Sequence, residues 1–373
     1  MRTDLDQSHH GKCLFWSETN IAAGVEMRNL LNDASRNVRA RIAGIYGILL
    51  VFNAGAWLWA VVAFRHYPLL LGTAFLAYSF GLRHAVDADH IAAIDNVTRK
   101  LMQEGKQPVA VGFMFSLGHS TIVVIGSAAI ASSALALQHR VDAFRTIGEF
   151  IGTIVSTVFL FGIAFVNLMV LRSVYRVFTS VREGSPYVEE DLNLLLADRG
   201  FLSRLFRPMF AMIRQSWHMY PLGLLFGLGF DTATEIGLLS ISATEASKGL
   251  PVTSTLVFPA LFAAGMSLVD TTDNILMLGA YGWASVKPVR KLYYNMTITL
   301  VSVVVALVVG GIEALALFAG RFHFSGIFWD TVRKVNGNFR MLGYLIIGLF
   351  VLSWILSIAF YKWQRFDDLE IQT

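Results

Sequence analysis

Seven apolar runs, each long enough to cross a bilayer, constrain the fold of this chain more than any other feature. They lie at about 42–64, 108–137, 147–171, 219–241, 253–281, 293–319 and 339–361. A hydrocarbon core of about 30 Å requires about 20 apolar residues in a helix. Only 15% of the 373 residues are charged, whereas soluble domains carry roughly 25%. We therefore expect an all-α integral membrane protein.

An eighth segment, 69–94, joins an apolar run to many charges. Its apolar part, "LLLGTAFLAYSFGL", is too short to span alone and leads into "RHAVDADHIAAIDN" at 83–96. If this segment crosses the membrane with the N-terminus in the cytoplasm, the cytoplasmic segments hold 21 Lys and Arg residues and the outside segments hold 8. Without it, every later loop changes sides, against the positive-inside rule. The sequence thus predicts about eight transmembrane helices, with both termini in the cytoplasm.

The spans divide the chain into five parts. These are a cytoplasmic tail at 1–41, helices 1–4 at 42–171, a cytoplasmic linker at 172–218, helices 5–8 at 219–361 and a cytoplasmic tail at 362–373. The linker is amphipathic and of mixed charge, which favours a connector with an interfacial helix over a regulatory domain. The polar start of the chain does not resemble a cleaved signal peptide.

Two pairs of similar stretches indicate an internal repeat. "FGLRHAVDADHIA" (80–92) resembles "FGLGFDTATEIG" (226–237), and "FSLGHS" (115–120) resembles "FAAGMS" (262–267). Segment 69–94 is expected to run from outside to inside and segment 219–241 from inside to outside. Related units of opposite direction are typical of transporters with inverted repeats.

The charges of segment 69–94 predict a cation site. On a straight helix His84, Asp87, His90 and Asp95 fall on one broad face, whereas Asp89 points away from His84. His84, Asp87 and His90 can then share one cation. Asp89 can join His84 only if the helix is bent or unwound between them, and a straight helix would favour Asp87.

Other predicted spans also carry polar side chains, each costing on the order of 3 kcal/mol at a helix centre. The candidates for a transport path are His119, Asp231, Thr234, Glu235, Asp270, Asp273, Asn274 and Asn53. A single buried histidine such as His119 is ordinarily a hydrogen-bonding core residue, and the carboxylate pairs serve equally well as interhelical hydrogen-bonding groups. Asn53 is expected to hydrogen-bond segment 69–94.

The kinds of side chain narrow the choice of cation. The carboxylates outnumber the basic groups within the predicted spans, which favours a positively charged ligand. Imidazole suits nickel, cobalt, copper and zinc, whereas alkaline-earth ions prefer oxygen ligands alone. Cys13 is the only cysteine, so a thiolate cluster is excluded and Cu(I) is disfavoured. The expected partners are a divalent transition-metal cation and the lipid bilayer, not nucleic acid.

Four motifs resemble the nickel/cobalt transporter family. "HAVDADH" fits the His-X4-Asp-His signature of this family at His84, Asp89 and His90. "FSLGHS", "LGFDTATE" and "GMSLVDTTD" resemble its three further signatures in the same order. "DNVTRKLMQ", "SWHMYPLG" and "KPVRKLYYNMTIT" resemble the bacterial nickel permeases that supply hydrogenase and urease. The resemblance covers nearly the whole chain past residue 41.

The resemblance implies a single-component permease of the bacterial inner membrane that takes up Ni²⁺, and also Co²⁺, without ATP hydrolysis or a cofactor. It implies a metal site at His84, Asp89 and His90, with Asp87 beside them. The sequence contains no P-loop motif, in agreement with a transporter that has no ATPase subunit. Nickel is favoured over cobalt only by the flanking resemblance, because both ions accept the same ligands.

Two other functions compete with this one. The first is a proton-coupled transporter of another solute on the same fold. The second is a membrane enzyme with a His-cluster metal site, which would need several His-rich clusters where this chain has one clear cluster. The sequence therefore favours a transporter over an enzyme.

Overall fold

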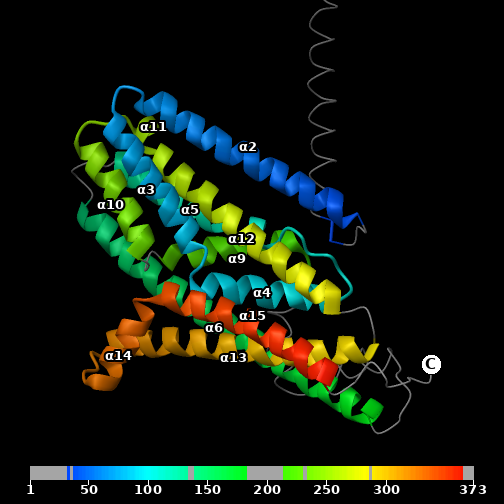
Figure 1. Ribbon diagram of the computed structural model, residues 1–373. Coiled ribbons are helices and arrows are strands. Elements are labelled where there is room, and N and C mark those ends of the chain that lie inside the picture. The colour runs from blue at the N-terminus through cyan, green and yellow to red at the C-terminus, as the bar shows by residue number, and fades with distance from the viewer. Residues whose placement is uncertain are drawn as a thin grey trace, which may run out of the picture.

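The computed structural model describes residues 32–33, 37–132, 138–182, 213–229, 233–284 and 288–363, and all regular elements in these ranges are helices (Figure 1). The longer helices are α2 (Val38–Phe64), α3 (Pro68–His84), α4 (Ala88–Gln103), α5 (Val111–Ser132), α6 (Gln138–Arg182), α9 (Met219–Phe226), α10 (Ala233–Ser247), α12 (Val257–Ala284), α13 (Pro288–Arg321), α14 (Ile327–Asn336) and α15 (Phe339–Trp363). Three short turns complete them: η1 (Ser216–His218), η2 (Gly227–Gly229) and α11 (Val252–Thr255). The predicted all-helical class is confirmed for the described residues.

Five described segments are long and apolar enough to cross a membrane. They are Val38–Phe64, Val111–Ser132, Phe150–Arg176, Val252–Tyr281 and Thr299–Arg321. Two bent pairs, α3 with α4 and α14 with α15, raise the number to seven if each pair is one span. The remaining predicted span, 219–241, is divided among α9, η2 and α10, and its residues 230–232 lie outside the described part. The chain is thus a multi-pass membrane protein with five to seven candidate spans by length and composition.

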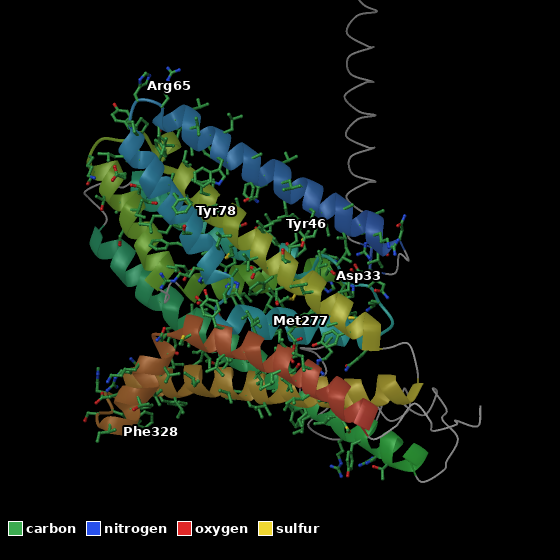
Figure 2. All side chains as sticks on the ribbon, in the orientation of Figure 1. Asp33, Tyr46, Arg65, Tyr78, Met277 and Phe328 are labelled. Carbon is green, nitrogen blue, oxygen red and sulfur yellow. The ribbon has the colours of Figure 1, made fainter. Side chains whose placement is uncertain are left out.

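The outermost helix, α2, has apolar sides and polar ends. Figure 2 places Asp33 and Arg65 at its two ends. Its exposed apolar side chains include Leu50, Val51, Leu58 and Val61. At one end, Arg41 and Ser216 donate hydrogen bonds to the buried Asp33 carboxylate at 3.1 and 2.7 Å. An apolar belt between polar ends is the surface that a bilayer requires.

Helix α4 is a polar helix in the middle of the bundle. It contacts α5, α6, α12, α13 and α15, and Figure 1 shows it between α12 and the pair formed by α13 and α15. The predicted span ended at residue 94, but the helix continues to Gln103 and buries Arg99. Because protein surrounds α4, its charged side chains can lie at membrane depth at a lower free-energy cost than they would have in contact with lipid.

The chain breaks between α3 and α4. Helix α3 ends at His84, α4 begins at Ala88, and the two axes form a bend of 51°. Asp87 has φ −67° and ψ 147°, an extended conformation that interrupts the helix. A Cβ atom on Gly343 of α15 would lie 1.7 Å from the Val86 carbonyl oxygen, so only glycine allows α15 to pack here. The bend that Asp89 would need to join His84 is therefore present.

Two helix crossings depend on glycine in a similar way. At the crossing of α3 with α12, a Cβ atom on Gly81 would lie 2.0 Å from the Phe262 carbonyl oxygen. At the crossing of α9 with α5, a Cβ atom on Gly223 would lie 2.1 Å from the Phe115 carbonyl oxygen. Small residues at such positions let helix backbones approach closely. Each crossing thus joins one helix from the first half of the chain to one from the second.

A second pair of glycines repeats this correspondence. Gly265 of α12 faces the backbone of Tyr78 and Leu82, and Gly118 of α5 faces the backbone of Tyr220 and Leu224. The contacts therefore relate α3 to α9 and α12 to α5. The similarity of "FGL" to "FGL" in the sequence had paired Gly81 with Gly227. The packing pairs Gly81 with Gly223 instead, about one helical turn earlier.

Candidate metal site

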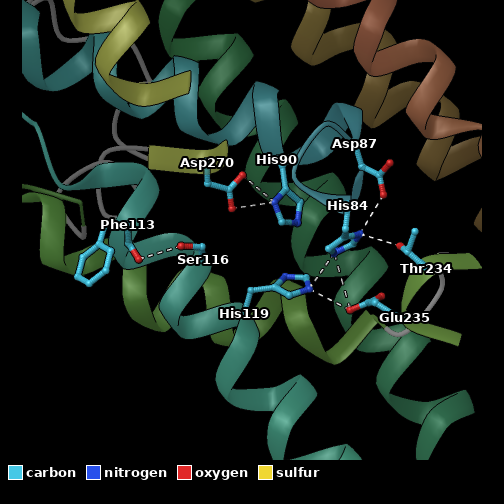
Figure 3. Close-up of polar contacts among 9 residues, drawn as sticks. All are labelled: His84, Asp87, His90, Phe113, Ser116, His119, Thr234, Glu235 and Asp270. Carbon is cyan, nitrogen blue, oxygen red and sulfur yellow. Dashed lines mark hydrogen bonds and ion pairs between the residues drawn. The ribbon is translucent and has the colours of Figure 1, made fainter. Parts of the chain in front are cut away.

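Three buried histidines converge where α3, α4 and α5 meet (Figure 3). His84 is the last residue of α3, His90 lies in the first turn of α4, and His119 lies in the middle of α5. One ring nitrogen from each lies within 4.8 Å of the other two. The Nε2 atoms of His84 and His119 are 3.0 Å apart. Two nitrogens bound at right angles to one metal, each at about 2.1 Å, are about 3 Å apart, so this spacing fits a shared metal ion.

Carboxylates contact the Nδ1 atoms of two of the imidazole rings. Nδ1 of His84 lies 3.0 Å from an Asp87 oxygen. Nδ1 of His90 lies 3.3 Å from both Asp270 oxygens. This is the carboxylate–histidine arrangement that orients metal-binding imidazoles through Nδ1 and leaves Nε2 for the metal. In the described part of the chain, Nε2 of His90 has no hydrogen-bond partner.

The second half of the chain adds two side chains from the first turn of α10. Glu235 Oε1 lies 2.9 Å from His119 Nε2 and 3.9 Å from His84 Nε2. Thr234 Oγ1 lies 3.3 Å from His84 Nδ1. Both side chains are buried. Three imidazoles and a carboxylate form a nitrogen-rich set of ligands that suits borderline divalent ions such as nickel, cobalt and zinc.

Asp89 stands beside this group without a direct contact to it. It directly precedes His90 in the first turn of α4. Its Oδ1 atom is buried and has no hydrogen-bond partner among the described residues. Asp87, in contrast, contacts His84 from the extended turn between the two helices. Of the two acidic residues of "HAVDADH", Asp87 thus contacts a histidine of the site, and Asp89 lies next to His90 along α4.

The remaining predicted residues that the structure describes lie elsewhere. Asp231 falls outside the described residues. We call His84, His90 and His119 the histidine group. Asp273 and Asn274 follow Asp270 along α12 and are not part of it. Asn274 donates a hydrogen bond to Thr98 at 2.8 Å. Asn53 makes the expected bond to the predicted segment 69–94, because it accepts a hydrogen bond from Tyr78 of α3 at 3.0 Å.

The structure gives Asp95 partners other than the histidines and adds residues that the sequence did not point to. A straight helix through 84–95 would place Asp95 on the broad face of His84 and His90, but the chain breaks between α3 and α4, and Asp95 accepts hydrogen bonds from Tyr281 and Ser302. Aromatic rings also enclose the imidazoles. The Phe115 ring centroid lies 4.9 Å from that of His90, and the Phe262 centroid lies 5.5 Å from that of His84. Phenylalanine in an apolar helix carries no signal that separates such a lining from ordinary core.

Comparison with known proteins gives a consistent result. The model of a family described as high-affinity nickel-transport protein matches residues 70–360. The chain is 59% identical over 352 residues to the high-affinity nickel transport protein of Cupriavidus necator, covering 94% of this chain and 99% of that protein. It is 42% identical to nickel transporter NicT of Mycobacterium tuberculosis, covering 88% and 90% of the two chains.

A third relative is named for another metal. The chain is 39% identical over 334 residues to the cobalt transport protein NhlF of Rhodococcus rhodochrous, covering 87% of this chain and 94% of that protein. No solved structure matches the chain.

Proposed function

This chain belongs to the family of high-affinity nickel-transport proteins, and on that premise we propose that it carries Ni²⁺, and also Co²⁺, inward across the bacterial inner membrane through the histidine group. It is a transporter and not an enzyme, and the metal ion is its substrate. We assign the predicted ligands His84, Asp87, Asp89 and His90 to this site and add His119 and Glu235.

One observation carries the assignment. Three imidazoles from three separate helices lie within 4.8 Å of one another in a buried site. Asp87, Glu235 and Asp270 surround them. The carboxylates favour a dication, and the imidazoles favour nickel or cobalt over magnesium or calcium. The cobalt transport protein among the relatives supports Co²⁺ as a second substrate.

We propose eight spans in two inverted repeats, with 219–241 as the fifth span and both termini in the cytoplasm. The distribution of Lys and Arg over the loops supports this orientation. The equivalent crossings of α3 with α12 and of α9 with α5 support the repeat. In this arrangement, 42–171 and 219–361 are the membrane parts, 172–218 is a cytoplasmic linker, and 1–41 and 362–373 are cytoplasmic tails.

The site takes side chains from both halves of the chain. The histidines come from the first half, and Thr234, Glu235 and Asp270 come from the second. A rocking movement of one repeat against the other would therefore change the ligand set as it changes the side to which the site opens. A membrane potential that is negative inside favours entry by about 2.3 kcal/mol per charge per 100 mV, and a dication gains twice that. In this scheme, a single chain needs no ATPase subunit.

Competition between metals tests the proposal. Labelled Ni²⁺ uptake should be measured in bacteria that lack their own nickel transporter, with unlabelled ions in excess. Excess Co²⁺ should inhibit uptake strongly, because it accepts the same nitrogen ligands, whereas Mg²⁺ should leave it unchanged. Uptake that is indifferent to excess unlabelled Ni²⁺ and Co²⁺ would point to another solute.

The role of Glu235 gives a second prediction. Glu235→Gln keeps the size of the side chain but removes its charge beside His119. We expect nickel affinity to fall by about 10–100-fold, so uptake should be slow at low nickel and recover at high nickel. Glu245→Gln on the same helix is the matched control, since Glu245 pairs with Lys248 at 2.9 Å. Equal effects of the two changes would contradict a role of Glu235 at the metal.

A further inference from the structure

Two phenylalanines occupy equivalent places in the two halves of the chain. The backbone of Phe262 on α12 meets Gly81 of α3, and the backbone of Phe115 on α5 meets Gly223 of α9. The sequence agrees with this pairing, because "FSLGHS" begins at Phe115 and the similar "FAAGMS" begins at Phe262. Both side chains are 0% exposed. The same type of residue thus stands at both copies of one position of the proposed repeat.

Both phenyl rings lie against the metal site, but each contacts a different histidine. The ring centroids of Phe262 and His84 are 5.5 Å apart, with the ring planes tilted by 35°. The ring centroids of Phe115 and His90 are 4.9 Å apart, edge to face at 85°. The two imidazole centroids are 4.6 Å from each other. The contacts therefore run from one phenyl ring through two imidazoles to the other phenyl ring.

The two phenylalanines lie at different depths in the membrane. In the proposed topology α5 runs outward from the cytoplasm, and α12 runs inward. The two helices meet where a Cβ atom on Gly112 of α5 would lie 2.0 Å from the Asp270 carbonyl oxygen of α12. From this contact Phe115 lies three residues outward and Phe262 eight residues outward. Phe262 is thus about 7.5 Å nearer the outside along the helix axes.

The direction of the side chains increases this separation. Side chains of an α-helix lean toward its N-terminus. The N-terminus of α12 is on the outside and that of α5 is on the cytoplasmic side, so the Phe262 ring leans outward and the Phe115 ring leans inward. The histidines therefore have an apolar ring on each side. Such rings offer a hydrated metal ion no ligand, and apolar constrictions stop ions by excluding water.

We propose that Phe262 closes the metal site toward the outside and that Phe115 closes it toward the cytoplasm. The inference rests on the proposed nickel transport. With both rings buried against imidazoles, the site is closed on both sides. Each phenylalanine also lies at a crossing that joins the two halves of the chain. A rocking movement of one half against the other would therefore withdraw one ring at a time from its histidine.

The reactivity of a thiol placed at the site tests which side each ring closes. Thr234→Cys puts this thiol beside His84, where the native hydroxyl lies 3.3 Å from Nδ1. Cys13→Ser removes the only native cysteine. The full chain with these two changes is the parent. Its rate of reaction with a charged, membrane-impermeant methanethiosulfonate is measured without nickel, in right-side-out and in inside-out membrane vesicles.

Each phenylalanine variant should open the site to one side only. Phe262→Ala should raise the reaction rate above that of the parent at least about tenfold in right-side-out vesicles, because a buried aromatic ring stabilises the state that encloses it. Phe115→Ala should do so in inside-out vesicles. Phe258→Ala is the matched control, since it removes a buried ring of the same helix α12 that stacks on Phe64 at 5.3 Å. The control should react at the parent rate from both sides.

The proposal is overturned if the Phe262 and Phe115 variants react at the parent rate from both sides, or faster from both sides equally. Rises on exchanged sides would overturn it as well. If an alanine variant does not accumulate in the membrane, leucine at that position keeps an apolar side chain without the ring. The leucine variant should then show a smaller rise on the same side.

Nickel binding separates this inference from the function it rests on. It is measured in parallel on the purified wild-type chain in lipid nanodiscs, by equilibrium dialysis. If the wild type binds Ni²⁺ tightly while the thiol reacts alike from both sides in every variant, only the role of the two rings is wrong. If the wild type binds no Ni²⁺, the proposed transport itself is wrong.

Discussion

Replacement of His90 by alanine is expected to reduce nickel uptake by at least about 100-fold. His90 supplies one of three imidazoles, and its Nδ1 is held by Asp270 at 3.3 Å. Loss of a residue that only orients a metal ligand costs about 10–100-fold in affinity or activity, and loss of a ligand should cost at least as much. The change also leaves the buried Asp270 carboxylate without the imidazole that it contacts.

The measurement is the initial rate of labelled Ni²⁺ uptake at equal abundance of the protein in the membrane. His66→Ala is the matched control, because His66 is exposed on the turn between α2 and α3. The control should transport at the wild-type rate. Uptake by His90→Ala close to that of the control would remove His90 from the metal site.

Gly223→Ala should have an effect of similar size for a different reason. The added Cβ atom would lie 2.1 Å from the Phe115 carbonyl oxygen and 3.0 Å from the His119 backbone nitrogen. Backbone atoms cannot relieve this overlap by a change of rotamer, so α9 and α5 must move apart. Overpacking typically costs about 1–3 kcal/mol, and here the displaced helix also carries His119. We expect little folded protein in the membrane and a loss of uptake by the protein that remains.

Abundance in the membrane and uptake per molecule are both measured for this variant. Gly348→Ala on α15 is the control, because a Cβ atom there meets nothing within 4 Å. The control should accumulate and transport normally. Normal behaviour of Gly223→Ala would show that the crossing of α9 with α5 tolerates a wider spacing than the structure has.

Much of the fold follows from the sequence because apolar length is a local property. Each of the five long spans appears in the sequence as an apolar run, and the run before "RHAVDADHIAAIDN" predicts α3. The sequence predicts the break after His84 only if Asp89 and His84 bind the same ion, because these two residues cannot share a face of a straight helix. The helix is bent by 51° at this place.

The site could be foreseen only in part, because packing assembles it. His119 alone resembles a core histidine, and its partners His84 and Glu235 are distant in sequence. A helical wheel drawn across the break relates Asp95 to His84, although the two residues lie on different helices. The sequence likeness of 80–92 to 226–237 aligns Gly81 with Gly227, whereas Gly81 and Gly223 make the similar close contacts with a facing backbone, which matching letters do not reveal.

The crossings of α3 with α12 and of α9 with α5 join the two halves of the chain, which has a consequence for biogenesis. Gly81 and Gly118 lie in the first half of the chain, but the backbones that they touch, at Phe262 and Tyr220, lie in the second. Because the chain is synthesised from its N-terminus, Gly81 and Gly118 are made before the backbones that they contact. These glycine contacts of the first half are therefore completed only after α9 and α12 have been synthesised.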